Sequence, residues 1–307
     1  MFSLPREQYE AKQPDLVAGL AGALREGKLS LLLGSGASHE LIRMSWHEIA
    51  NTCSRVTAAR HPDREADLAA TFTADTPGED MFRRMETVRK LLGDGAYLEL
   101  VSQTLYTNFS PGRAANAPEL LRAIGALATA SRHGSVKDIV TLNFDCSLEW
   151  YLGLHGTVTQ VVSRWPTVLG NSDVTVYHPH GYLPVAAAFG SRSEMIVFDS
   201  IEVDRQLAAR TPWREIFKQL MVSRYVLAIG LGGRDYVLRT LLYEAMDDVK
   251  EQSARPLGCW LCTDSVDDET RDQIRARGFI APRVSKDDIP VLLTAICEEA
   301  RQRILRW

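Results

Sequence analysis

The sequence predicts an α/β fold with a doubly wound, mostly parallel sheet, and two observations lead to this prediction. Short apolar runs, such as those in KLSLLLGSGAS and RYVLAIGLGG, alternate along the chain with stretches of helical periodicity. Glycine, Asn, Asp or His residues follow the apolar runs, as expected for turns at the carboxyl ends of strands. Because continuous apolar runs are typical of strands buried on both faces, we expect a Rossmann-like sheet covered by helices on each side.

The first half of the chain contains one predicted strand followed by a long helical stretch. A helix is expected at 14–27, where apolar residues recur at helical spacing between Pro14 and Gly27. The strand of KLSLLLGSGAS then ends at Gly34. Further helices are expected at 45–60, 81–92, 97–106 and 117–131, with a polar loop or insertion at 61–80. We expect residues 45–131, approximately, to form a smaller helical insertion.

The second half alternates more regularly. Apolar and β-rich runs predict strands within 138–145, 157–163, 174–181, 193–199, 224–233 and 257–264. Helices are expected at 146–153, 211–221 and 235–252, and at the C-terminus at about 287–306. We therefore expect residues 1–307 to form a single catalytic domain that carries the helical insertion.

Composition excludes several classes of protein. The chain has a formal net charge of −4, whereas a mainly electrostatic nucleic-acid binder needs a basic surface, so no direct nucleic-acid binding is expected. Its five cysteines are odd in number and scattered, which argues against a disulfide framework and favours a reducing compartment. The N-terminal MFSLPREQYEAKQPD carries charges where a signal peptide needs apolar residues. With no apolar run near the ~18 residues of a membrane span, a cytoplasmic protein without membrane contact is expected.

The first predicted strand runs into a turn formed by Gly34, Ser35, Gly36, Ala37 and Ser38. Such a turn can direct backbone N–H groups at a pyrophosphate, with the next helix N-terminus adding partial positive charge. The dehydrogenase fingerprint needs a third glycine where this chain has His39, and no acidic residue follows at the expected distance. A nucleotide turn and a purely structural glycine turn both remain open.

Polar side chains also follow later strands. Asn143 and Asp145 lie at i and i+2 and can both face a bound ribose or amide, or they can form an Asx turn or helix cap. His178 and His180 come after the next β-rich run. A histidine of near-neutral pKa can accept a proton from a sugar hydroxyl or from water, whereas the alternative is a structural role. No third ligand accompanies them, so no metal site is expected.

Two further motifs can be explained either by ligand binding or by a purely structural role. Gly230 and Gly232 end an apolar strand and permit close approach to a ligand, and Asp235 is placed to cap the next helix; the alternative is an ordinary strand–turn–helix connection. Cys259 and Cys262 match C-x-x-C but lie within an apolar strand, where residues i and i+3 face opposite sides. We expect both cysteines in the core.

The ordered set of motifs resembles the sirtuin-like family, in particular its bacterial branch of NAD-consuming defence effectors. LLLGSGAS is similar to the family's first nucleotide turn and SWHEIA to the helix start that follows it. VTLNFD resembles the Thr-x-Asn-x-Asp segment, HPHG the catalytic His-Gly, and LAIGLGGRDYVLRTLL the Gly-x-Ser-x-x-Asp segment, with Gly232 at the serine position. The resemblance spans roughly residues 28–264.

The resemblance implies a role for each matched position. His180 would be the base, Asn143 would position the nicotinamide ribose and the attacking water, and Asp145 would contact the nicotinamide carboxamide. The remaining contacts to NAD+ are implied for the turn residues Gly34, Ser35, Gly36, Ala37 and Ser38, for Gly230, Gly232 and Asp235, and for Thr263 and Asp264 near the adenine ribose.

The implied activity is NAD+ hydrolysis to nicotinamide and ADP-ribose, by an effector of bacterial antiphage defence acting through abortive infection. The zinc-binding cysteine pairs of deacylating sirtuins are missing from the sequence, so zinc is not expected and protein deacylation is the less favoured alternative. A non-catalytic NAD+ or ADP-ribose binding module is the other alternative, although it would not need His180 and Asn143.

The resemblance also bears on partners. No appended sensor domain is visible in the sequence, so we expect either a fragment of a longer effector or activation by a separate protein, such as a HerA-type ATPase or another phage-sensing subunit. Homo-oligomers are common in the family, and the helical stretches 84–131 and 287–306 are candidate interfaces.

Overall fold

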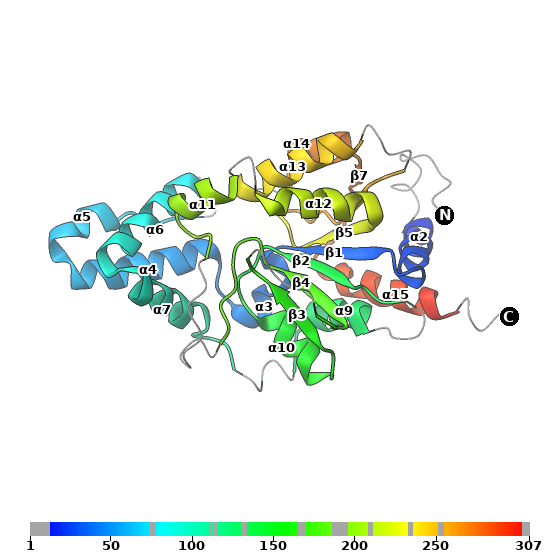
Figure 1. Cartoon of the computed structure of the whole chain (residues 1–307), viewed down its shortest axis with the longest axis horizontal. Coiled ribbons are helices and arrows are strands. Elements are labelled where there is room, and N and C mark those ends of the chain that lie inside the picture. The colour runs from blue at the N-terminus through cyan, green and yellow to red at the C-terminus, as the bar shows by residue number, and fades with distance from the viewer. Residues whose placement is uncertain are drawn as a thin grey trace.

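A seven-stranded sheet forms the centre of the protein (Figure 1). A computed structural model describes residues 13–73, 78–110, 112, 116–129, 134–164, 170–185, 196–207, 211–232, 236–250 and 255–302. The strands are β1 (Leu29–Leu33), β2 (Asp138–Thr141), β3 (Thr159–Val162), β4 (Val174–Tyr177), β5 (Tyr225–Ile229), β6 (Gly258–Trp260) and β7 (Phe279–Ile280). Every pairing between them is parallel, and their order is β3-β4-β2-β1-β5-β6-β7. The predicted doubly wound, Rossmann-like α/β fold is confirmed.

The sheet extends from β1 towards both edges. The chain builds β2, β3 and β4 on one side of β1 and then returns to place β5, β6 and β7 on the other side. Such a switch point leaves a crevice at the carboxyl ends of the two central strands, where ligands bind in open α/β sheets. The turns after β1 and β5 therefore meet at the position where this fold places its site.

The central strands separate two hydrophobic cores. In β1, Leu29, Leu31 and Leu33 face one core and Leu32 faces the other, as the alternation of side chains along a strand requires. The first core is shared with helices α2 (Gln13–Arg25), α9 (Glu119–Thr129), α10 (Ser147–Leu154) and α15 (Asp288–Gln302). The second is shared with α12 (Pro212–Ser223), α13 (Tyr236–Lys250) and α14 (Asp268–Ala276). Both faces of the sheet are thus covered by helices, as Figure 1 shows.

Helices between β1 and β2 extend beyond the end of the sheet (Figure 1). They include α4 (Trp46–Arg60), α5 (Glu65–Leu68), α6 (Gly78–Leu92) and α7 (Asp94–Leu105), and α11 (Ser200–Leu207) packs against α6. A capping box starts α4, because the Ser45 hydroxyl accepts the Glu48 N–H and the Glu48 carboxylate accepts the Ser45 N–H. By contrast, α9 packs on α15 beside the sheet. The division into a catalytic domain and an insertion at 45–131 stays a prediction.

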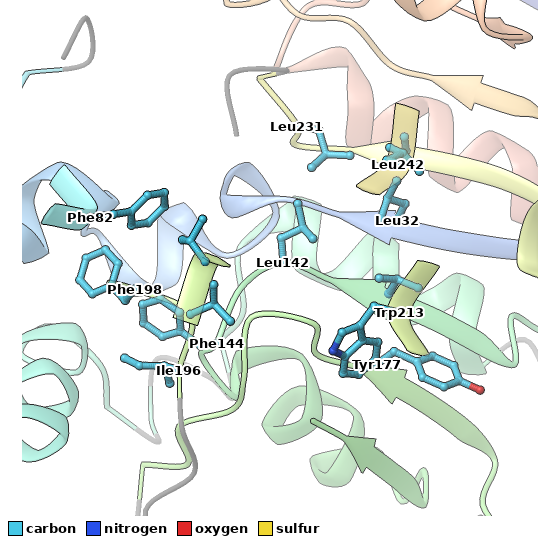
Figure 2. Packing of buried hydrophobic residues seen from close by; sticks show 14 of the residues in the cluster. Leu32, Phe82, Leu142, Phe144, Tyr177, Ile196, Phe198, Trp213, Leu231 and Leu242 are labelled. Carbon is cyan, nitrogen blue, oxygen red and sulfur yellow. The ribbon is translucent and has the colours of Figure 1, made fainter. Parts of the chain in front are cut away.

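The core on the α12 side continues without a break into the helical extension. Figure 2 shows Leu32 and Trp213 near the sheet and Phe82, Phe144 and Phe198 farther towards the extension, all within one buried cluster. Because a densely packed interior transmits small displacements, movement of the extension would alter the carboxyl end of β2.

A buried ionic network also ties the extension together. Arg89 on α6 donates to Asp199 at 2.9 Å and to Glu202 at 3.1 Å, and Asp199 is completely buried. Burial would lower the pKa of the Arg89 guanidinium, but its hydrogen bonds to Asp94, Asp199 and Glu202 outweigh this effect and raise the pKa. Asp199 also accepts the Glu202 N–H at the start of α11. The network therefore fixes residues 196–202 against α6.

The helices and strands depart from the sequence predictions in several places. No strand forms in the described part of 193–199: residues 196–199 are irregular, because they are held by the contacts of Asp199 and by the carbonyl of His180 rather than by a neighbouring strand. Residues 193–195 lie outside the described residues. The polar stretch 61–80, predicted as a loop, contains α5 and the start of α6. The helices α11 and α14 and the two-residue strand β7 were not predicted.

Replacing Gly125 by Ala should lower the stability of the fold. A Cβ atom at Gly125 in α9 would lie 2.2 Å from the ring of Tyr151, whereas one at Gly95 in α7 would meet nothing within 4 Å. We expect Gly125→Ala to lose about 1–3 kcal/mol of unfolding free energy through overpacking. The control Gly95→Ala should gain up to about 1 kcal/mol from helix propensity. Urea denaturation measures both, and equal effects would contradict the packing of α9 on α10.

Replacing Arg89 by Met should be far more damaging than replacing Arg83 on the same helix. The Arg89 side chain is 14% exposed and faces buried carboxylates, while that of Arg83 is 69% exposed. Removing one partner of a buried ion pair typically costs about 3–5 kcal/mol, and an exposed pair contributes at most about 1 kcal/mol. Denaturant unfolding of Arg89→Met and Arg83→Met measures the difference. Similar losses would show that the Arg89 network does not stabilise the extension.

Candidate functional site

The turns that follow β1 and β5 are in direct backbone contact. A Cβ atom on Gly34 would lie 2.4 Å from the Gly230 oxygen, and one on Gly36 would lie 2.8 Å from the Gly230 Cα. Gly230 itself has φ +70°, a conformation that glycine adopts without strain. The three glycines therefore allow the two turns to close together at the switch point of the sheet.

The backbone N–H groups of the β1 turn are used within the fold. Gly34 donates to the Ile229 carbonyl at 3.0 Å and Gly36 to the Gly230 carbonyl at 3.1 Å. Ala37 and Ser38 donate to carbonyls inside the turn itself, and the Ser35 side chain is exposed. The structural alternative for the glycines thus has a direct physical basis, while contact of this turn with a pyrophosphate stays a prediction.

A chain of side-chain hydrogen bonds joins the ends of β1 and β2. The Asn143 amide Nδ2 donates to the Ser38 hydroxyl at 3.0 Å and to the Gly34 carbonyl at 3.1 Å. The Ser38 hydroxyl in turn donates to Asp145 Oδ2 at 2.8 Å. Four of the predicted site residues, from two separate turns, are therefore brought together. Among the described residues, the buried Asn143 Oδ1 has no hydrogen-bond partner, which leaves one acceptor at the centre of the cluster.

Asp145 also stabilises the local chain. Its Oδ1 accepts the Ser147 N–H at 3.0 Å, so the Asx-turn alternative is confirmed at the start of α10. Burial raises the pKa of the Asp145 carboxyl, although the hydrogen bonds from Ser147 and Ser38 oppose the rise. Each carboxylate oxygen accepts one of these hydrogen bonds and has a further lone pair with which it could accept a bond from a ligand amide.

The two predicted histidines have different surroundings. Both ring nitrogens of His178 are engaged: Nδ1 lies 2.8 Å from the Asn143 carbonyl and Nε2 lies 2.7 Å from Glu149 Oε1. His180 instead packs its ring against Trp46 at a centroid distance of 5.3 Å. Gly181, at φ +88°, turns the chain directly afterwards. His178 cannot accept a substrate proton without giving up a buried partner, so His180 is the better candidate base.

Aromatic side chains enclose this part of the molecule. Trp46 contacts Phe144 and Phe198 at centroid distances of 5.5 Å, and Figure 2 shows both phenylalanines beside Phe82 of α6. Val197 donates its N–H to the His180 carbonyl at 2.8 Å. The segment held by the Arg89 network therefore packs directly on the segment of His180, and the aromatic rings exclude water from it.

A small cavity opens between the polar cluster and the aromatic residues. It has a volume of about 20 Å³ and is lined by residues that include Ser35, Ser38, Trp46, Asn143, Phe144 and Asp145. Such a cavity holds about one water molecule, whereas ligand pockets typically measure about 300–1,000 Å³. Binding of a dinucleotide here would require the turns or α4 to move apart.

Other predicted residues lie farther from this cluster or outside the described part of the chain. Gly232 is exposed after β5, and Asp235 lies outside the described residues. Thr263 and Asp264 follow β6. The Thr263 hydroxyl contacts the Ser265 hydroxyl, and the Thr263 carbonyl accepts a hydrogen bond from Arg283. The hydrogen bonds of the Asn143 cluster do not include these two residues, and their role at an adenine ribose stays a prediction.

The cysteine prediction is confirmed. Cys259 and Cys262 are completely buried, and they belong to different cores on opposite sides of the sheet. Within the described ranges, no group of three or more His, Cys, Asp or Glu side chains could hold a metal ion. In the same part of the chain, no helix is long and apolar enough to cross a membrane.

Sequence reasoning missed three residues that shape the site. Glu149 lies on α10, the helix that follows the turn after β2, and its carboxylate binds His178. The Tyr106 hydroxyl, at the end of α7, accepts the Cys146 N–H and donates to the Leu183 carbonyl, which joins the segments after β2 and β4. Trp46, inside SWHEIA, packs on His180. Two sequence signals were present: the acidic residue in the apolar helix after VTLNFD, and the SWHEIA segment that contains Trp46.

The chain was compared with known proteins. Residues 137–281 match the family model described as a SIR2-like domain, a range that holds β2 to β7 with Asn143, Asp145 and His180. No curated protein matches the chain. A solved structure reported under the words "Structural Basis for the Mechanism and Regulation of Sir2 Enzymes" is similar at 15% identity and a TM-score of 0.48, over 95% of this chain and 99% of that chain. Residues 137–281 of this chain are therefore similar to a SIR2-like domain.

Proposed function

We propose that this protein hydrolyses NAD+ to nicotinamide and ADP-ribose, as an NAD+-depleting effector of the kind that the motif resemblance implies. A SIR2-like domain suggests an NAD-related enzymatic or binding function. The observation that carries the proposal is the Asn143 Oδ1 atom, which is buried and has no partner among the described residues. A buried acceptor without a partner costs about 1–3 kcal/mol, and a ligand hydroxyl or water would remove that cost.

The surrounding side chains support hydrolysis in particular. In this reaction the bond between the ribose C1′ and the nicotinamide nitrogen breaks, and its electron pair neutralises the positive pyridinium ring. A water oxygen bonds to C1′, and its proton leaves through a base. Asn143 would accept a hydrogen bond from the water or a ribose hydroxyl, and His180 would take the proton. Asp145 would face the nicotinamide carboxamide.

A binding module without catalysis is the second candidate. His180 is only 1% exposed, and the neighbouring cavity holds about one water molecule. A protein that only binds a nucleotide needs no accessible base, so this burial favours the second candidate. Hydrolysis needs the aromatic cover over His180 to open, and we propose that an activating partner or self-assembly provides this change.

Replacing His180 or Asn143 by Ala should abolish nicotinamide release. A positioned general base typically contributes about 10²–10⁴-fold to the rate. The rate of nicotinamide release should therefore be at least about 10²-fold lower in His180→Ala than in the wild type. Free nicotinamide is measured by chromatography after incubation of the purified protein with NAD+, and total NAD+ is measured in cells that express each variant. His155→Ala is the matched control, because His155 is exposed at the end of α10.

The two candidates predict different results in the same assay. Hydrolysis predicts NAD+ loss with the wild type and the control, and none with the two site variants, while all four melt at similar temperatures. Calorimetric binding of NAD+ without nicotinamide release, in the test tube and in cells, would instead support the binding module. Undiminished turnover in His180→Ala and Asn143→Ala would exclude the proposed site.

A further inference from the structure

His178 and Glu149 form a buried pair beside the proposed catalytic asparagine. His178 is 0% exposed and Glu149 is 8% exposed. The ring of Tyr182 covers His178 at a centroid distance of 4.9 Å. His178 is therefore closed off from solvent, and Glu149 is nearly so.

The hydrogen bonds of His178 define where its protons lie. The Asn143 carbonyl oxygen, 2.8 Å from Nδ1, can only accept, so Nδ1 carries a hydrogen. The second proton lies between Nε2 and Glu149 Oε1, which are 2.7 Å apart. The Glu149 carboxyl thus fixes the orientation of the ring, and the ring fixes the Asn143 carbonyl.

The charges around the ring support this arrangement. Burial lowers the pKa of His178, but the charge and hydrogen bond of Glu149, the Asn143 carbonyl and the charge of Asp145 outweigh it, so the pKa stands above its ordinary value. A raised histidine pKa contributes stability that is complete below about pH 6.5 and is lost as the pH rises through the folded value. The protonated ring is therefore the form that the fold favours.

Packing alone does not require a buried ion pair at this position. A buried ion pair can often be replaced by apolar side chains without loss of stability, and Glu149 Oε2 has no hydrogen-bond partner among the described residues. What the pair achieves, and apolar side chains would not, is a directed hydrogen bond to the main chain of Asn143. On its other side, the Asn143 amide is held by Gly34 and Ser38.

We propose that His178 and Glu149 are positioning residues that orient Asn143, so that its Oδ1 faces the substrate in the reactive geometry. This inference rests on the proposed function only for the identity of the substrate. The pair holds the Asn143 main chain, the Gly34–Ser38 turn holds its amide nitrogen, and the acceptor oxygen is left for the ligand. A displacement of about 1 Å in such a group can reduce a rate by about 10²-fold.

Three variants separate positioning from simple packing. His178→Asn retains a donor near the position of Nδ1 and should keep the bond to the Asn143 carbonyl. His178→Leu removes both hydrogen bonds, and Glu149→Gln keeps the size of the acid but removes its charge. We expect kcat for NAD+ to fall by about 10–100-fold in His178→Leu and less in His178→Asn and Glu149→Gln. KM should change little, and the exposed-site control His155→Asn should resemble the wild type.

A spectroscopic measurement tests the proposal independently of activity. The side-chain amide signals of Asn143 are followed by ¹H–¹⁵N NMR, assigned by their loss in Asn143→Ala. We expect them to shift strongly in His178→Leu and weakly in His178→Asn, while the His178 Nδ1–H signal persists in Glu149→Gln with an altered titration. If the Asn143 amide signals are unchanged in Glu149→Gln and in the folded His178 variants, the positioning proposal is overturned.

The outcomes distinguish this proposal from the proposed function. If the wild type releases no nicotinamide but the Asn143 signals shift as expected, the pair positions Asn143 and NAD+ hydrolysis is wrong. If the wild type is active but Glu149→Gln and a folded His178→Leu retain full kcat and unchanged signals, hydrolysis stands and the positioning role is wrong. Because Glu149→Gln changes only one atom, it gives a result even if His178→Leu fails to fold.

Discussion

The Ser38 hydroxyl is the contact on which the candidate site depends. It accepts from the Asn143 amide and donates to the Asp145 carboxylate, and so joins the turn after β1 to the turn after β2. The close approach of Gly34 and Gly36 to Gly230 then places the turn after β5 against the same point. His178 adds the segment after β4 through the Asn143 carbonyl. The segments after β1 and β4 therefore both bind Asn143 at the end of β2, the turn after β5 packs on the β1 turn, and Asn143 Oδ1 is left as the acceptor at the centre of the site.

The fold was largely predictable because short runs of consecutive residues indicate its strands and helices. Apolar runs such as β1 and β5 are buried on both faces, and this alone indicates a parallel sheet between two layers of helices. The stretch 193–199 shows the limit: its apolar residues suggested a strand, yet residues 196–199 pack as irregular chain against aromatic rings and the Arg89 network. Long-range contacts of Asp199 decide that structure, and they leave no periodic pattern in the sequence. The two-residue β7 is too short to leave a pattern, whereas the nine-residue α14 begins at a capping Asp267 that could have predicted it.

The site was predictable only in part. That Ser38, Asn143 and Asp145 lie together follows from parallel strands ending at the same edge. The pairing of His178 with Glu149 does not follow, because it depends on β4 lying next to β2 while β3 occupies the sheet edge, an order that alternation cannot define. The roles of the glycines also differ from the first interpretation: their proximity to each other, and the donation of the turn's N–H groups to carbonyls, account for them before any phosphate is considered.

A crystal structure of the His180→Ala variant with NAD+ tests the central claim most directly, because the missing base should leave the substrate intact. We expect the nicotinamide ribose to lie at the carboxyl ends of β1 and β2, with a ribose hydroxyl or an ordered water within hydrogen-bond distance of Asn143 Oδ1. We also expect Trp46 and residues 196–199 to have moved away from residue 180. A dinucleotide bound elsewhere, with the Asn143 cluster unchanged and its Oδ1 still untouched, would contradict the account.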